Sequence, residues 1–569
     1  MARLAFRFLL VGFLATALAG DQSLGQDGAQ QPGIVPQDSH TTSETKAQFK
    51  SQAILIQVPV VVTDKSGNHI HNLSQQDFTI FQNDKEQKIA VFEEVNSTSA
   101  RRLPTPSSPG VFGNLSLQNE QPSSITIILL DMVNTPFLNQ TYGRAQLVKF
   151  LKQNLHSGPV LALMVISGKG LKVISSVTDD STILIGALKT VTGEISVMQG
   201  FSTEAQARAA SGEAFSVLGN GLESDAEARL REFVLRTEAV ESFYWQQRAI
   251  EETLRAFLSI AWSLAGVPGR KSVVWATGGF PFYLGSPSTV ALDAGLAPLY
   301  ERTMEALNDA QISVYPVDVG GLMSASGLGH PPLSFLGDPR RQQLQSSLQD
   351  YTIDSFRNFA EMTGGRPFYN DNDLARGFQR AIEDSSSYYS TGYYLDTHRT
   401  RRGWQRLHVN VQRKDVEVRA RNGFVVGNFL LNPESLHKAD INFALDSPVD
   451  STGVPVRVRW TAPAPGESSQ RKAEFVITVP ATGVFNESNG NRFDMDFIWE
   501  TDKGGSRANR HGQTIKGALT TEGLLKVKSE GLSYKNVLEL PPGDYAVRFV
   551  IRNNLSGRIG SVTAPLTVN

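Results

Sequence analysis

A loop with side chains that can bind a ligand follows one of the most apolar stretches of the chain. Residues 125–130 read ITIILL, and the next five residues, from Asp131 to Thr135, read DMVNT. Carboxylate and hydroxyl oxygens are hard ligands suited to Mg²⁺ or Mn²⁺, and magnesium keeps several waters, so few protein ligands suffice. In open α/β sheets, ligands bind outside the carboxyl ends of the strands. The loop is therefore a candidate binding site.

A second loop of this kind follows the apolar strand predicted over Ser272–Ala276. It begins with Thr277 and Gly278 and continues into a stretch with three aromatic residues. Exposed aromatic side chains are typical contact anchors at protein interfaces, and packing beneath neighbouring segments is the alternative for them. The residues that we expect on a shared binding face are Asn134, Thr277, Phe280, Phe282 and Tyr283.

The composition excludes several classes of function. The chain of 569 residues has no cysteine, which excludes disulfides, thiolate metal sites and a cysteine nucleophile. It has 54 basic and 56 acidic residues, so it lacks the basic balance of a nucleic-acid binder. It contains neither an H-E-x-x-H zinc motif nor a G-x-S-x-G nucleophile elbow. We therefore predict a protein that is not an enzyme and has no catalytic residues.

The N-terminus has the features of an export signal. Arg3 and Arg7 precede an apolar run over residues 8–19, which ends in Ala-Leu-Ala. This pattern predicts a signal peptide over residues 1–19, cleaved after Ala19, with an uncleaved anchor as the alternative. The run is short for a membrane span, and no later segment has the length of one. We expect an exported protein, periplasmic or secreted, with no integral membrane domain after cleavage and no nucleic-acid partner.

The rest of the chain divides by composition and by hydrophobic pattern. Stretches rich in Pro, Ser, Gly or Gln read as linkers, short alternating runs as strands, and alternating strands and helices as a mostly parallel sheet. From residue 438 onward, turn signals recur and no helix is expected. The predicted parts are a disordered linker at 20–50, a small β module at 51–97, a Pro/Ser linker at 98–123, an α/β domain at 124–385 with insertions near 196–223 and 320–350, a β extension at 386–426 packed with the preceding domains, and a β-sandwich at 438–569.

Several segments together resemble a known family. They are VVVTDKSGNHIHNLSQQDFTIFQNDKEQKI, ITIILLDMVNT, VPGRKSVVWATGGFPF, FAEMTGGRPFYND and YYSTGYYL with VEVRARNGF, within residues 51–426. Their order is similar to that of von Willebrand factor type A-related proteins exported by bacteria. The resemblance implies a doubly wound α/β (von Willebrand A/Rossmann-like) central domain flanked by all-β modules. We expect the C-terminal module to be an Ig-like or fibronectin-like β-sandwich.

The resemblance also implies a metal-ion-dependent adhesion site, which in this chain is degenerate. Asp131 and Thr135 match the first and fifth positions of its Asp-x-Ser-x-Ser loop, while Val133 replaces the middle serine. Thr203 is the candidate for the second loop, and Gly278 stands where the third loop has an aspartate. Two alternatives follow: Mg²⁺ or Mn²⁺ bound through Asp131, Thr135 and Thr203, or no cofactor, with Asp131 capping a turn and Thr135 bonding to backbone.

These observations lead to three functional hypotheses. The first is an exported, non-enzymatic binding or adhesion protein, which binds an extracellular or envelope protein through the face described above. The second is a metal-independent structural scaffold of the cell envelope. The third, less favoured, is a hydrolase.

Overall fold

The computed structural model describes most of the chain outside the predicted leader, linkers and insertions. The predicted signal peptide and linker at 1–50 and both predicted insertions lie outside the described residues. The described ranges are 53–96, 110–114, 125–154, 160–194, 244, 247–279, 296–319, 353–369, 373–396, 400–401, 403–426, 433–461, 464–465, 470–485 and 490–568.

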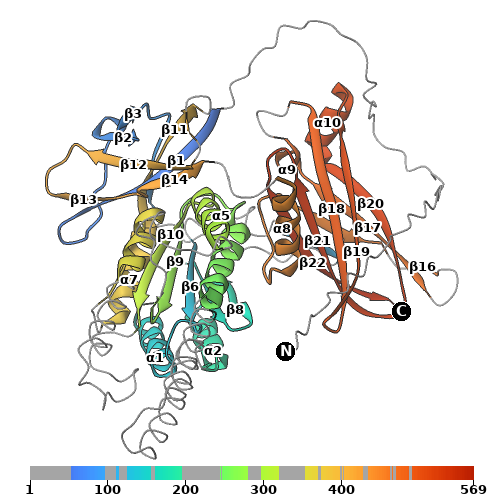
Figure 1. Ribbon diagram of the computed structural model, residues 1–569, viewed down its shortest axis with the longest axis horizontal. Helices are drawn as coiled ribbons and strands as arrows, with labels where there is room; N and C mark the ends of the chain where they lie inside the picture. Colours follow the sequence, from blue (N-terminus) through green and yellow to red (C-terminus); the bar gives the residue numbers. More distant parts are fainter. Residues whose placement is uncertain are drawn as a thin grey trace, which may run out of the picture.

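A five-stranded sheet occupies the middle of the chain, in the order β10-β9-β6-β7-β8 (Figure 1). Its strands are β6 (Ile125–Asp131), β7 (Val160–Ser167), β8 (Gly170–Thr178), β9 (Lys271–Thr277) and β10 (Ile312–Asp318). The first four strands in this order are parallel, and β8 is antiparallel to β7. Leu130 of β6 lies beside Ala276 of β9. The loops that follow β6 and β9 therefore leave the sheet at the same edge.

Helices pack on this sheet, and we call the whole the central unit. Leu147 of α1 (Phe137–Asn154), Leu188 of α2 (Ser181–Thr190) and Phe378 of α7 (Leu374–Ser386) belong to one apolar cluster. Residues of α5 (Leu296–Asp309) and of the helices over 247–264 and 353–363 belong to a second. The strands expected at 125–130 and 272–276 are confirmed within one residue at each end.

The prediction of a doubly wound α/β fold is wrong for the residues that the structure describes. These residues are mostly β, with 46% in strands and 31% in helices. Four of the five sheets pair their strands only antiparallel, and the fifth ends in the antiparallel pair of β7 and β8, so a doubly wound α/β domain is not shown. The physical reason is that an apolar run predicts a strand covered on both faces without fixing the direction of its neighbours.

Strands that precede the central unit in the sequence pair with strands that follow it. Together they form a unit of residues 53–96 and 387–426, which we call the N-terminal β unit. Its two sheets have the orders β13-β1-β11-β4 and β14-β12-β2-β3. Val58 and Val60 alternate along β1 and enter the same core as Tyr389 and Tyr393 of β11. The strands are β1 (Ala53–Asp64), β2 (Phe78–Gln82), β3 (Lys85–Gln87), β4 (Val91–Asn96), β11 (Ser387–Asp396), β12 (Gly403–Val411), β13 (Val416–Arg419) and β14 (Gly423–Val426).

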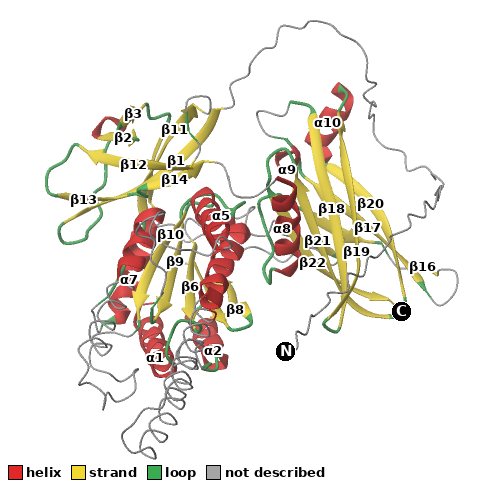
Figure 2. Ribbon diagram, viewed as in Figure 1, coloured by secondary structure: helices red, strands yellow, loops and turns green. Residues whose placement is uncertain are grey.

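Two further antiparallel sheets form a C-terminal β unit, residues 111–114 and 433–568 (Figure 2). One contains β16-β17-β15-β5 with β20 beside β17, and the other has the order β19-β18-β21-β22. Phe475, Phe497 and Phe549 belong to their shared core. The strands are β5 (Val111–Gly113), β15 (Arg457–Trp460), β16 (Ala464–Pro465), β17 (Arg471–Val479), β18 (Arg492–Lys503), β19 (Ser506–Ala518), β20 (Leu532–Leu540), β21 (Gly543–Asn553) and β22 (Ile559–Val568).

The expectation that residues 438–569 hold only strands is wrong. The unit contains α8 (Pro433–Asp446), α9 (Ala481–Val484) and α10 (Thr521–Glu530). Helix α10 begins after Thr520, whose side chain accepts a hydrogen bond from the N–H of Gly523, and ends at Gly531 with φ 84°. Both features are ordinary helix-end signals, but the apolar pattern between them is too short to stand out from the surrounding strands.

The C-terminal β unit is joined to the central unit at two places. Helix α8 lies between α5 and the sheet that contains β21 (Figure 1), and Arg302 of α5 forms an ion pair with Asp440 of α8. The second joint is Thr452, whose N–H donates to Trp262 O at 2.9 Å and whose hydroxyl donates to Ser263 O at 2.9 Å. The C-terminal β unit also includes β5, which lies within the predicted linker at 98–123 and pairs with β15. The next residue, Asn114, is buried and donates a hydrogen bond to Ser451 O at 2.6 Å. This part of the predicted linker is therefore a strand.

Candidate functional site

The carboxylate of Asp131 lies at the end of β6 and is 1% exposed. Its Oδ1 accepts hydrogen bonds from the backbone N–H groups of Val133 at 3.0 Å and Asn134 at 2.9 Å. Its Oδ2 accepts from Trp275 Nε1 at 3.1 Å and lies 3.0 Å from the hydroxyl of Thr277. The Thr277 hydroxyl is also 2.8 Å from Gly279 O, so its single proton has two acceptors within reach. Both carboxylate oxygens are thus directed at protein donors.

Asn134 connects this carboxylate to the helix over 247–264. Its Nδ2 donates to Asp131 Oδ2 at 2.8 Å and to Thr253 Oγ1 at 2.9 Å. The Thr253 hydroxyl donates in turn to Ala249 O at 2.8 Å. Asn134 Oδ1 is buried and has no hydrogen-bond donor in the described part of the chain. We call Asp131, Asn134, Thr253, Trp275 and Thr277 the Asp131 cluster.

The two loops predicted to meet at this edge are in direct contact. Thr135 Oγ1 accepts a hydrogen bond from the backbone N–H of Gly278 at 2.8 Å. A Cβ atom at Gly278 would lie 2.9 Å from Pro136 Cδ and 3.1 Å from Thr135 Cα. Real Cβ contacts are rarely that short, so the loop has no room for the aspartate that the resemblance places there.

The electrostatics of the cluster follow from its burial. Burial raises the pKa of Asp131, while the hydrogen bonds from Asn134, Thr277 and Trp275 oppose that rise. A divalent metal at Asp131 would have to replace hydrogen bonds that the carboxylate already accepts. Among the described residues, no group of three or more His, Cys, Asp or Glu could hold a metal ion. The geometry favours the turn-capping alternative over the metal-bound one.

Of the other predicted site residues, some lie outside the described residues and the rest are buried. Thr203, Phe280, Phe282 and Tyr283 lie outside the described residues. Asn134 and Thr277 are buried, with 5% and 0% exposure, so neither presents a surface to a partner in this arrangement. That these residues belong to a binding face stays a prediction.

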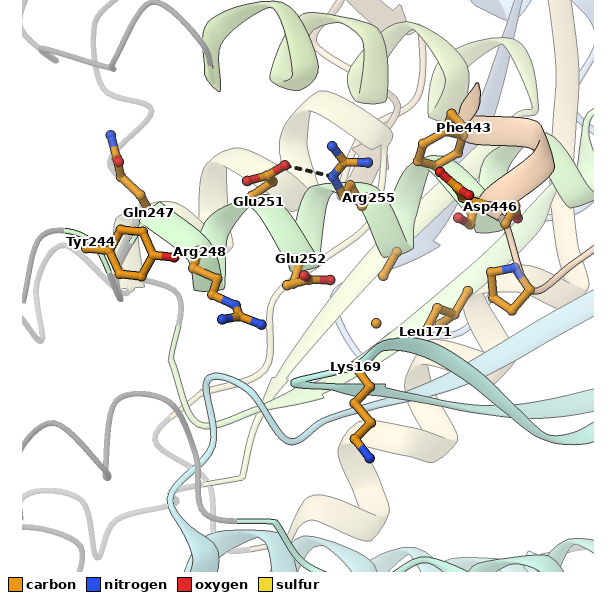
Figure 3. A pocket seen from close by; sticks show the side chains of 15 residues that line it. Lys169, Leu171, Tyr244, Gln247, Arg248, Glu251, Glu252, Arg255, Phe443 and Asp446 are labelled. Atoms are coloured by element: carbon orange, nitrogen blue, oxygen red, sulfur yellow. Dashed lines mark hydrogen bonds and ion pairs between the residues drawn. The ribbon is translucent and has the colours of Figure 1, made fainter. Parts of the chain in front are cut away.

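A groove that the sequence did not indicate lies beside the same helix. It has a volume of about 550 Å³ and runs between the outer face of 247–264, the turn between β7 and β8, and the end of α8 (Figure 3). Leu171, Ala256 and Phe443 in its lining are buried apolar residues. Charged side chains stand around them, among them Arg248, Glu251, Glu252, Arg255 and Asp446. We call this feature the helix groove.

The acidic residues of the helix groove differ in their partners. Glu251 accepts a hydrogen bond from Arg255 Nε at 2.8 Å, and Asp446 forms an ion pair with Arg507. Glu252 is half-buried, and within the described ranges no hydrogen bond or ion pair reaches its carboxylate. Burial raises the pKa of Glu252, although Arg255 and Arg248 attract the charged form. Glu252 is therefore a carboxylate that a positively charged ligand would stabilise.

The sequence contained only part of the signal for this groove. The inward stripe of the helix, which includes Ile250, Leu254 and Phe257, is predictable from its spacing and is buried. The outward face carries charged residues at 248, 251, 252 and 255, a pattern that an ordinary solvent-exposed helix also shows. The residues that make it a groove belong to α8, about 190 positions later in the chain.

No family model and no curated protein matches this chain. The resemblance to von Willebrand factor type A-related proteins rests on the sequence segments quoted above and stays a prediction. In the part of the chain that the structure describes, every helix is too short or too polar to cross a membrane.

Proposed function

We propose that the protein is an exported, non-enzymatic binding protein that takes a basic segment of a partner protein into the helix groove. The observation that carries the proposal is the Glu252 carboxylate, which lies in the groove without an ion-pair partner among the described residues. A lysine or arginine side chain would supply the missing charge, and its aliphatic stem would lie along Leu171 and Ala256. Export and the relation to von Willebrand factor type A-related proteins are part of the proposal and are supported by the sequence alone.

The size and lining of the helix groove support this occupant. A volume of about 550 Å³ falls in the usual range of ligand sites, which combine an apolar lining with a few polar groups. Arg255 already pairs with Glu251 and Arg507 with Asp446, so among the described acidic residues of the groove Glu252 is the one left for a basic ligand, while Lys169 and Arg248 also line the groove. A partner segment with one basic residue next to an apolar one would match both the carboxylate and the apolar lining.

The Asp131 cluster has a supporting part in this proposal. Thr253 and Glu252 are neighbours on one helix, and the Thr253 hydroxyl accepts a hydrogen bond from the Asn134 side chain. The cluster thereby fixes the helix whose outer face lines the groove. In this arrangement binding does not depend on a metal, since the Asp131 oxygens are directed at protein donors.

A peptide selection tests the proposal. Short linear peptides displayed on phage would be selected on the immobilised full chain, and enriched peptides measured by fluorescence anisotropy. We expect enrichment of Lys or Arg beside an apolar residue. Affinity should fall about tenfold, or 1.4 kcal/mol, in Glu252→Gln and stay unchanged in Glu522→Gln, an exposed carboxylate of α10.

Replacing the basic residue of the peptide by citrulline should cause the same loss in wild type and no further loss in Glu252→Gln, because both changes remove one contact. Enriched peptides that bind Glu252→Gln as tightly as wild type would contradict the groove as the site. Robust turnover of generic esterase, peptidase or glycosidase substrates would contradict the non-enzymatic proposal.

A further inference from the structure

A second, much smaller cavity lies where the N-terminal β unit meets the central unit. Pro59 of β1 and Arg421, between β13 and β14, line it from one side. Asn308 of α5, Ser313 of β10 and Thr363 line it from the other. The cavity has a volume of about 10 Å³, which is room for one buried water or a single ion of similar size.

Two buried nitrogen donors in this cavity have no acceptor among the described residues. They are Arg421 Nε and Asn308 Nδ2. Arg421 is 8% exposed and Asn308 is 6% exposed, so bulk water does not compensate them. A buried donor without an acceptor costs about 1–3 kcal/mol, and more when the group is charged. Two such groups in one cavity indicate that it holds an acceptor.

The hydroxyl groups of the wall cannot serve as that acceptor without breaking other bonds. Ser313 Oγ donates to Thr363 O at 3.0 Å and accepts from Arg270 Nε at 3.0 Å. Thr363 Oγ1 lies 2.8 Å from Phe359 O, to which it donates, and accepts from the N–H of Val314 at 3.0 Å. Both hydroxyls therefore have a donor and an acceptor elsewhere, and the buried groups of the described lining that lack a partner are the N–H donors of Arg421 and Asn308.

The charge of Arg421 decides what kind of acceptor fits. Its Nη2 donates to Gln57 O at 2.7 Å, and its guanidinium lies over the Phe424 ring, 5.5 Å from the centroid. No carboxylate forms an ion pair with it within the described ranges, although Asp309 attracts it through space. Burial lowers the pKa of Arg421 to about 10, so the guanidinium still carries its charge at neutral pH. A buried cation without a bonded counter-ion favours an anion over a neutral water.

We infer that this cavity binds one small monoatomic anion of the chloride class, held by Arg421 Nε–H and Asn308 Nδ2–H. The anion accepts hydrogen bonds from both units at once, because Arg421 belongs to the N-terminal β unit and Asn308 to the central unit. It therefore stabilises their junction. This inference is independent of the groove and of the proposed function.

Thermal unfolding of the full chain tests the anion site. Chloride, bromide and gluconate would be compared as sodium salts at equal ionic strength. An anion that binds only the folded state raises the folding constant in proportion to its concentration once the concentration exceeds Kd. We expect a Tm that rises with the logarithm of chloride or bromide concentration and does not rise in gluconate.

Two variants and a control assign that effect to the cavity. Asn308→Asp places a carboxylate beside Arg421, and Arg421→Met removes the charge, so both should lose the chloride dependence. Arg401→Met, at an exposed arginine, should keep it.

Crystals of the wild-type protein grown in bromide keep the test decisive if a variant fails to fold. An anomalous peak within hydrogen-bond distance of Arg421 Nε and Asn308 Nδ2 supports the inference. An ordered water in the cavity, together with equal Tm in chloride and gluconate, overturns it.

Discussion

The indole Nε1 of Trp275 lies 3.1 Å from Oδ2 of Asp131. The two residues come from the neighbouring parallel strands β9 and β6, in which Trp275 is paired with Leu129, two residues before Asp131. Trp275 is 0% exposed, and its ring packs edge-on against Phe257 of the helix over 247–264, with centroids 5.2 Å apart. A side chain fixed by the apolar core thus orients the carboxylate at the edge of the sheet.

Asp131→Asn should destabilise the fold. The variant replaces one carboxylate oxygen by an amide NH₂, which would face donors that now have no acceptor. Each unsatisfied buried group costs about 1–3 kcal/mol, and we expect a loss of about 2–3 kcal/mol in unfolding free energy, measured by urea denaturation. Asp179→Asn, at an exposed position, is the control and should unfold like wild type. An unchanged midpoint for Asp131→Asn would show that the hydrogen bonds do not stabilise the native state.

Divalent metals should leave the melting temperature unchanged. Both Asp131 oxygens already accept hydrogen bonds from the protein, so a metal would gain a ligand only by breaking them. The measurement is thermal unfolding of the full chain with EDTA, Mg²⁺, Mn²⁺ or Ca²⁺ at millimolar concentration. A metal-dependent rise that disappears in Asp131→Ala would reverse this expectation, because a ligand that binds the folded state must raise Tm.

Side chains at Gly278 should be poorly tolerated. A Cβ there would lie 2.9 Å from Pro136 Cδ, and added volume in a tightly packed site typically costs about 1–3 kcal/mol. We expect this loss for Gly278→Ala and a larger one for Gly278→Asp, the aspartate expected from the resemblance. Gly186→Ala in α2 meets nothing within 4 Å and should be neutral or stabilising by about 0.5–1 kcal/mol. Urea denaturation of the three variants compares them, and a stable Gly278→Asp would disprove the steric argument.

The sequence predicts features that depend on local pattern and on the meeting of strand ends. The apolar runs at 125–130 and 272–276 identified β6 and β9. Because these two strands are neighbours in the sheet, the loops that follow them meet, and Thr135 contacts Gly278. The sequence did not predict that β8 runs antiparallel to β7, because a pattern of buried residues does not determine strand direction. It also missed β5, whose three residues Val111–Gly113 lie between stretches rich in Pro and Ser and acquire their structure by pairing with β15.

The candidate sites show the same limit. Asp131 was identifiable because it follows a buried strand. Its contact with Trp275, and the hydrogen bond from Asn134 to Thr253, depend on packing between distant segments. The helix groove needs α8, and the anion cavity needs Arg421 beside Asn308, two residues more than 100 positions apart. Such juxtapositions are set by the assembled units rather than by any local spacing.

Stability should depend on pH through Lys271, at the start of β9. The side chain is 2% exposed, and its Nζ donates to Val267 O at 2.6 Å. Burial lowers the pKa of Lys271 from 10.5 to about 7. Between these values the unfolded chain binds more protons than the folded one, so the unfolding free energy rises with pH, by up to about 1.4 kcal/mol per pH unit. Below pH 7 both states are protonated, and the buried charge costs its full amount.

Lys271→Met isolates this contribution. The variant removes the buried charge at similar volume, so we expect it to be more stable than wild type at pH 6 and the difference to shrink steadily toward pH 9. Urea denaturation at each pH gives the difference, and Lys526→Met, at an exposed position of α10, should show no such trend. A difference that stays constant with pH would mean that Lys271 titrates alike in both states.

The joint between the central unit and the C-terminal β unit should depend on Arg302. Its guanidinium pairs with Asp440 of α8 and lies over the Trp262 ring, 4.8 Å from the centroid. Arg302→Met leaves Asp440, 9% exposed, with Arg552 at 3.5 Å as its one ion-pair partner among the described residues. Removing one partner of a buried pair typically costs about 3–5 kcal/mol. We expect calorimetry to resolve two unfolding transitions in Arg302→Met and one in Arg357→Met, whose exposed pair contributes about 1 kcal/mol or less. An unsplit transition at the wild-type Tm would place the coupling elsewhere, and Thr452, which is hydrogen-bonded to Trp262 and Ser263, would be the next joint to test.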